Sequence, residues 1–113
     1  MKNILIAEDT YSNYLLLSVI LNKHYNLAHA VNGQEAVEKA RNQHYHIILM
    51  DIRMPVMDGY QATREIREFD METPIVALSA NVFSDEVQNA FEAGMDDFLE
   101  KPIAIPRLLA TLR

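Results

Sequence analysis

Short apolar runs that each lead into a charged or hydroxyl side chain recur along this chain of 113 residues. The polar side chains that close these runs are Glu8, Asp9, Asp51, Ser79 and Lys101. Runs of this length, bounded by turn residues, are typical of buried strands. A carboxylate at the end of a buried strand is costly unless it is paired, hydrated or bound to a metal. The pattern therefore predicts a polar site along one edge of a sheet.

The apolar runs alternate with segments of helical spacing. Strands are expected at residues 4–7, 26–31, 47–50, 74–78 and 98–99. Helices are expected at residues 13–23, 34–41, 60–69 and 84–93, and a final helix has Pro106 in its first turn. Strands separated by helices imply an α/β fold with a parallel sheet covered on both faces. The ligand crevice of such a sheet lies beyond the carboxyl ends of its strands, where the polar residues converge.

The composition fits one domain that spans residues 1–113 and narrows what it can bind. Ten Lys and Arg residues against 16 Asp and Glu residues give a net charge of −6, which argues against direct binding of nucleic acid. The chain has no cysteine, which excludes disulfides and thiolate chemistry. It has no apolar run of membrane-spanning length and no secretory signal, so we expect a cytoplasmic domain without membrane contact.

Glu8, Asp9 and Asp51 would together form an oxygen-rich and strongly negative cluster. Mg2+ suits such a cluster because it is a hard cation that prefers oxygen ligands and keeps several waters. Asp51 can act as a carboxylate nucleophile that forms an acyl phosphate. Ser79 can donate its hydroxyl to a phosphoryl oxygen, and Lys101 can supply a compact positive charge. The set therefore suits phosphoryl transfer, which needs mainly positioning and charge neutralisation.

Each of these residues also has a purely structural interpretation when it is taken alone. Glu8 with Asp9, or Asp51, can cap the helix that follows. Ser79 can simply end a strand, and Lys101 can be solvated. The phosphoryl-transfer hypothesis rests on their shared position at strand ends of one alternating fold.

The chain resembles the receiver domains of response regulators in two-component signalling. The likeness is clearest at residues 50–59, MDIRMPVMDG, which resemble the phosphoacceptor loop of that family. Residues 4–9, 74–80 and 94–102 resemble its other signature segments in order and spacing. The resemblance implies a flavodoxin-like, doubly wound sheet of five parallel strands in the order 2-1-3-4-5, with five helices.

The resemblance also implies a role for each acidic residue of the site. Asp51 is the residue that would be phosphorylated. Asp9 and Asp51 would bind Mg2+ directly, and Glu8 would bind it mainly through water. The backbone carbonyl of Arg53 would be a further metal ligand, while its long side chain would be available to the phosphoryl group or to partners.

Ser79 and Lys101 would bind the phosphoryl group by the same resemblance. Ser79 and Phe98 would form the conformational switch, although Phe98 stands where many receivers have Tyr or His and lacks a hydroxyl. The Lys101–Pro102 peptide bond would be cis, which proline makes accessible.

The implied partner is a histidine kinase or a histidine phosphotransfer domain that donates its phosphoryl group to Asp51. Phosphorylation would shift a two-state surface formed by the fourth helix, the fifth strand and the fifth helix, through which the domain could also self-associate. At most, self-phosphorylation from small phosphodonors and slow self-dephosphorylation are expected, so the domain is predicted not to be an enzyme.

The helix expected at residues 13–23 has more apolar residues than one buried side requires. Its inner side is expected to hold Asn13, Leu16, Leu17, Ile20 and Leu21. Leu15 and Val19 lie away from that side and could form a docking patch for a phosphodonor helix. The alternative is that they are scattered apolar residues on an ordinary surface.

Two other functions remain open at this point. A small Mg2+-dependent phosphatase with an aspartyl-phosphate intermediate would share the carboxylates, the serine and the lysine. It would normally need a second acid two residues after Asp51, where this chain has Arg53, and a cap domain for its substrate. A phosphorylation-independent interaction module is the other alternative, and the complete acceptor set argues against it.

The last helix looks truncated after Leu112, which suggests a domain excised from a longer protein. Residues 54–59 and 77–81 resemble the receivers of hybrid sensor histidine kinases, whose parent protein would itself be a kinase. A separate response regulator is the alternative.

Overall fold

The computed structural model describes residues 1–82 and 85–112 as a doubly wound α/β domain. Its strands are β1 (Lys2–Ala7), β2 (Tyr25–Ala30), β3 (Ile47–Asp51), β4 (Ile75–Ser79) and β5 (Asp97–Glu100). Its helices are α1 (Tyr11–Leu21), α2 (Gly33–Asn42), α3 (Gly59–Arg67), α4 (Glu86–Ala93) and α5 (Ile105–Leu112). All strand pairs are parallel, and the sheet order is β2-β1-β3-β4-β5. The predicted fold and strand order are therefore confirmed.

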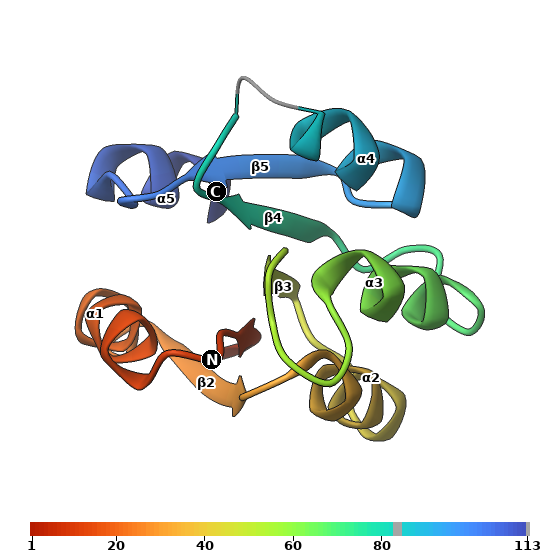
Figure 1. Cartoon of the computed structure of the whole chain (residues 1–113). Coiled ribbons are helices and arrows are strands. Elements are labelled where there is room, and N and C mark those ends of the chain that lie inside the picture. Colours follow the sequence, from red (N-terminus) through yellow and green to blue (C-terminus); the bar gives the residue numbers. More distant parts are fainter. Residues whose placement is uncertain (83–84, 113) are drawn as a thin grey trace.

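Helices cover both faces of the sheet, as Figure 1 shows. On one face, α1 and α5 bury Leu17, Leu21, Leu108 and Leu112 against the sheet. On the other face, α2, α3 and α4 pack over a second core cluster. Because both faces are covered, β3 and β4 are buried at every residue, which explains their uninterrupted apolar sequences.

Local signals in the sequence fix several helix ends. The side chain of Asn32 accepts a hydrogen bond from the Glu35 amide at the start of α2, and Asp58 accepts one from the Gln61 amide at the start of α3. Gly94 ends α4 with a φ of 112°, in the left-handed region that glycine adopts at little cost. The expected start of this helix at Ser84 lies outside the described residues.

Helix α1 differs from its prediction in its bounds and in its inner side. It begins at Tyr11 instead of residue 13 and ends at Leu21 instead of residue 23. Leu17 and Leu21 are buried as expected, but Leu16 is 66% exposed and Asn13 is exposed too, so their predicted inward placement is wrong. The helix packs on the core through the buried Leu17 and Leu21 and the partly buried Tyr14 and Ile20.

Candidate functional site

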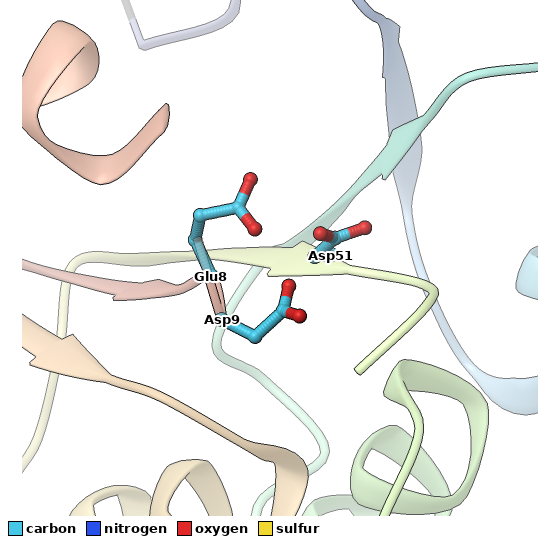
Figure 2. A group of neighbouring side chains, drawn as sticks. All are labelled: Glu8, Asp9 and Asp51. Atoms are coloured by element: carbon cyan, nitrogen blue, oxygen red, sulfur yellow. The ribbon is translucent and has the colours of Figure 1, made fainter. Parts of the chain in front are cut away.

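Three carboxylates meet at the carboxyl ends of β1 and β3, as predicted (Figure 2). Glu8 and Asp9 directly follow β1, and Asp51 is the last residue of β3. Each contributes an oxygen to a group in which all three atoms lie within 4.8 Å of one another. Glu8 is 1% exposed and Asp51 is 5% exposed, whereas Asp9 is open to solvent.

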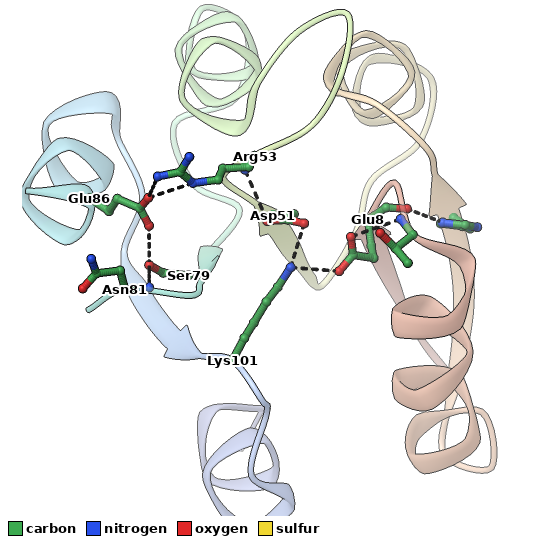
Figure 3. A network of polar contacts seen from close by, with 9 residues as sticks. Glu8, Asp51, Arg53, Ser79, Asn81, Glu86 and Lys101 are labelled. Atoms are coloured by element: carbon green, nitrogen blue, oxygen red, sulfur yellow. Dashed lines mark hydrogen bonds and ion pairs between the residues drawn. The ribbon is translucent and has the colours of Figure 1, made fainter. Parts of the chain in front are cut away.

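Lys101 lies between the two buried carboxylates (Figure 3). It follows β5, and its Nζ donates to Asp51 Oδ2 at 2.8 Å and to Glu8 Oε1 at 3.1 Å. Burial works to lower the pKa of Lys101, but hydrogen bonds and charge attraction from Asp51 and Glu8 outweigh it and raise that pKa. The Lys101–Pro102 peptide bond is cis, as the resemblance implied.

The pKa of the Asp9 carboxyl is raised above its usual value. Although the residue is exposed overall, partial loss of hydration is the largest cause, followed by a hydrogen bond with Glu8 and by the repulsion of the Glu8 charge. Even with Lys101 nearby, the charged form of Asp9 is therefore disfavoured in the folded domain. Three oxygen donors with excess negative charge fit a hard divalent cation such as Mg2+.

Ser79 ends β4 and is 1% exposed. Its hydroxyl donates to Glu86 Oε1 at 2.7 Å, and its Oγ accepts from the Asn81 amide at 3.1 Å. The structure thus brings Ser79 to the expected edge of the sheet, but its proton points to a carboxylate on α4 (Figure 3).

Arg53 lies in the loop after β3. Its amide donates to Asp51 Oδ1 at 3.2 Å. Its guanidinium crosses to α4, where Nε donates to Glu86 Oε2 at 3.0 Å and Nη2 forms a second bond to the same oxygen. Burial works to raise the pKa of Glu86, but the bonds from Ser79 and Arg53 prevail and lower it.

Glu86 was not singled out by the sequence analysis. Its only sequence signal is its place near the start of the fourth predicted helix, where acidic residues are common because they complement the helix dipole. The structure shows that it joins Ser79, seven residues before it, to Arg53, which is 33 residues before it.

Phe98 is half-buried on β5, between α4 and α5. Its ring meets the Phe91 ring edge to face at 6.4 Å between centroids. The Arg107 guanidinium lies 5.9 Å from the Phe98 ring centroid on the other side. The predicted switch residue therefore contacts both helices of the predicted switch surface.

The apolar side chains of α1 that face solvent form a second candidate surface. Leu15, Leu16 and Val19 are 45%, 66% and 66% exposed. With Ile103 and Ile105 they line a groove of about 600 Å3, which we call the α1 groove. The exposure expected for Leu15 and Val19 is confirmed. Within the described residues, no helix is long and apolar enough to cross a membrane.

Comparison with known proteins agrees with this geometry. A family model of the response regulator receiver domain matches residues 4–113. Hybrid signal transduction histidine kinase G of Dictyostelium discoideum is 41% identical over 111 residues, which cover 93% of this chain and 3% of that protein. Across the first five curated relatives, the chain spans only 3% to 17% of their length.

Solved structures show the same likeness. The receiver domain of sensor histidine kinase PA1611 from Pseudomonas aeruginosa has a TM-score of 0.93 and 39% identity, over 98% of this chain and 93% of that one, and it has a magnesium ion coordinated in its active site cleft. A chain in the co-crystal structure of the Saccharomyces cerevisiae phosphotransfer protein Ypd1 and the Ssk1 receiver domain has a TM-score of 0.90 and 33% identity, over 98% of this chain and 86% of that one. The chain described here therefore belongs to the response regulator receiver domain family.

Proposed function

We propose that this domain accepts a phosphoryl group from a phosphohistidine partner onto Asp51. The observation that carries the proposal is the buried Asp51 carboxylate, held by Lys101 Nζ at 2.8 Å beside two further carboxylates. Such a group is positioned as a nucleophile and is unsuited to a surface role. The remaining site residues have roles that follow from their contacts.

An Asp51 carboxylate oxygen would attack the phosphorus of the phosphohistidine. The new O–P bond would form as the P–N bond breaks, and the imidazole would leave with the bonding electron pair and take a proton from solvent. Lys101 would follow the developing negative charge, because its Nζ already contacts Asp51. Ser79 would supply a hydrogen bond to a phosphoryl oxygen.

Glu8, Asp9, Asp51 and the Arg53 carbonyl would hold Mg2+. Bound there, Mg2+ would neutralise charge on the carboxylates and on the phosphoryl oxygens. The carboxylate cluster and the magnesium ion of the Pseudomonas aeruginosa relative support this assignment. The Arg53 carbonyl is carried over from the family alone.

We propose the α1 groove as the surface that receives the phosphodonor. An amphipathic donor helix could place apolar side chains on Leu15, Leu16 and Val19. The co-crystal structure of Ypd1 with the Ssk1 receiver supports a histidine phosphotransfer domain as one class of donor. Self-association through α4, β5 and α5 remains a prediction, as does a cytoplasmic location.

The parent protein is proposed to be a hybrid histidine kinase. Two of the curated relatives are named hybrid signal transduction histidine kinases, and the chain spans 3% and 6% of them. The domain itself is proposed to be a signalling module with no turnover of an external substrate. Position 53 supports this over a phosphatase, because the Arg53 side chain is bound to Glu86 and offers no acid or base to a substrate.

Intact mass spectrometry after exposure to acetyl phosphate and magnesium tests the proposal. We expect the parent domain to gain one phosphoryl group and Asp51→Asn to gain none, because an amide is not a usable nucleophile here. Asp58→Asn is the matched control in the same loop, since asparagine also caps a helix. Labelling of Asp51→Asn at the parent level would refute Asp51 as the acceptor.

A further inference from the structure

The hydroxyl group of Ser79 has one proton and can donate only one hydrogen bond. In this structure that proton goes to Glu86 Oε1 at 2.7 Å, while the Oγ accepts from the Asn81 amide. The hydroxyl therefore cannot donate to a phosphoryl oxygen on Asp51 until it leaves Glu86. In the unphosphorylated site, the Glu86 carboxylate therefore competes with a future phosphoryl group for the Ser79 hydroxyl.

Glu86 also forms an ion pair with Arg53, the second cationic side chain of the site besides Lys101. Its second carboxylate oxygen, Oε2, accepts from the guanidinium of Arg53 (Figure 3). The backbone amide of the same arginine donates to Asp51. The Glu86 side chain is 12% exposed, whereas that of Arg53 is 80% exposed. The carboxylate is thus the fixed member of the pair, and Arg53 is the member that is free to turn towards a phosphoryl group.

We propose that Glu86 is a latch that holds Ser79 and Arg53 in the unphosphorylated arrangement and is displaced when Asp51 is phosphorylated. This inference rests on the proposed function of Asp51. Glu86 touches neither Asp51 nor its substrate in the described contacts, so it is a positioning residue. A phosphoryl group carries more negative charge than one carboxylate and has three acceptor oxygens. It can therefore replace Glu86 as the acceptor for both the Ser79 hydroxyl and the Arg53 guanidinium.

The latch would link the site directly to the predicted switch surface. Glu86 is the first residue of α4, and its bonds tie that end of the helix to the end of β4 and to the loop after β3. Loss of these bonds would remove the side-chain link between α4 and β4, while the Tyr60 hydroxyl still donates to the Glu86 carbonyl at 3.0 Å. Phe91 on the same helix contacts Phe98 edge to face, so movement of α4 would reach Phe98 through packing.

Glu86→Ala tests the latch with beryllofluoride and magnesium as the phosphoryl substitute. We expect the variant to bind beryllofluoride on the order of tenfold more tightly than the parent, because two donors no longer have to be released. Without beryllofluoride, the Phe98 NMR signals of the variant should already lie part-way towards the bound position. Glu86→Gln keeps the size of the side chain and should show a smaller change in the same direction.

Two comparisons separate a latch from a general structural effect. Glu92→Ala removes an acid from the same helix and should bind like the parent, because Glu92 accepts from the exposed Gln88 alone among the residues that the structure describes. In a Ser79→Ala background, Glu86→Ala should keep only the part of its tightening effect that comes from Arg53, because the contested hydroxyl is gone. A structural perturbation would instead weaken binding in either background.

The outcomes also distinguish this inference from the proposed function. If the parent binds no beryllofluoride and takes up no phosphoryl group, both proposals are wrong. If the parent binds but Glu86→Ala and Glu86→Gln bind equally well or more weakly, Asp51 remains the acceptor and the latch is refuted. Equal tightening with and without Ser79 would also refute the latch.

Discussion

At the residue scale, the site contains three acidic side chains, Glu8, Asp9 and Asp51, and one basic side chain, Lys101. Lys101 contacts Asp51 and Glu8 at hydrogen-bond distance, yet the pKa of Asp9 is still raised by burial and by Glu8. The cluster is therefore costly to the folded domain in the absence of a cation. Function here opposes stability, and the conflict can be measured.

Asp51→Asn should stabilise the magnesium-free domain by about 1 kcal/mol. The substitution removes one negative charge from the cluster, and Lys101 keeps Glu8 as a partner at 3.1 Å, so no buried charge is left alone. Urea denaturation at neutral pH with a chelator measures the difference. Magnesium should then stabilise the parent more than the variant, because the parent has the larger ligand set. If Asp51→Asn is less stable than the parent when both are measured with the chelator, this reasoning is wrong.

The sequence predicted the residues of the cluster but not the contacts of Ser79 and Arg53. The carboxyl ends of parallel strands lie along one edge of the sheet in any side-chain conformation. The sequence could therefore predict that Glu8, Asp51 and Lys101 lie close together. The bond from Ser79 to Glu86 depends on a rotamer and on the position of α4, and neither leaves a pattern in the sequence. Hydrogen bonds of this kind can be identified only from the folded structure.

At the scale of elements, Arg67 joins two connections that are distant in sequence. From the end of α3, its guanidinium donates to the carbonyls of Asp70, Thr73 and Gly94 and pairs with Asp96 at 2.8 Å. These bonds hold the α3–β4 connection beside the α4–β5 connection. The side chain is 11% exposed, so the carbonyls have no easy replacement partner in water.

Arg67→Ala should lower the free energy of unfolding by about 2–3 kcal/mol, since several hydrogen bonds to a buried charge are lost together. Arg67→Lys should recover little, because an ammonium group cannot reproduce the planar set of donors. Arg64→Ala is the control on the same helix. Within the described part of the chain its exposed guanidinium bonds to Gln61 alone, so the substitution should cost less than about 0.5 kcal/mol. Similar losses for Arg67→Ala and Arg64→Ala in urea denaturation would rule out this role.

The existence and order of the elements followed from sequence, while several boundaries did not. Strand β2 ends at Ala30, one residue before the prediction, because the Val31 amide turns to donate to the Glu35 side chain. Helix α3 ends at Arg67 and not at Phe69, whose ring lies under the Arg41 guanidinium at 4.5 Å. Periodicity identifies an apolar segment, but side-chain contacts decide its last residue.

At the scale of the whole molecule, the sheet separates function from support. The carboxyl ends of β1, β3, β4 and β5 carry the site. The Arg67 network lies at the opposite ends of β4 and β5, where the Asp96 carboxylate accepts from the Ile75 amide. Asp70 belongs to this distant end: its carboxylate accepts from the amides of Glu72 and Thr73 and from the Thr73 hydroxyl. Acid stability can therefore be tested without touching the site.

Burial works to raise the pKa of Asp70, but hydrogen bonds from Thr73 and Glu72 and the charge of Arg67 prevail and lower it. The unfolded chain, with an aspartate pKa of about 3.9, then binds the proton more readily than the folded domain. The stabilisation from Asp70 is thus complete above about pH 4 and is lost as the pH falls through the folded pKa.

Asp70→Asn should accordingly be less stable than the parent by about 1 kcal/mol at pH 7, because the amide oxygen keeps some of the hydrogen bonds but not the charge. The difference between the two proteins should shrink as the pH is lowered below about 4, because the Asp70 carboxylate of the unfolded parent takes up a proton before that of the folded parent does. Urea denaturation of both proteins from pH 7 to pH 3 measures it, with Glu68→Gln, an exposed neighbour, as the control that should differ little from the parent throughout. A difference between Asp70→Asn and the parent that stays constant over this range would show that the charge of Asp70 does not support the fold.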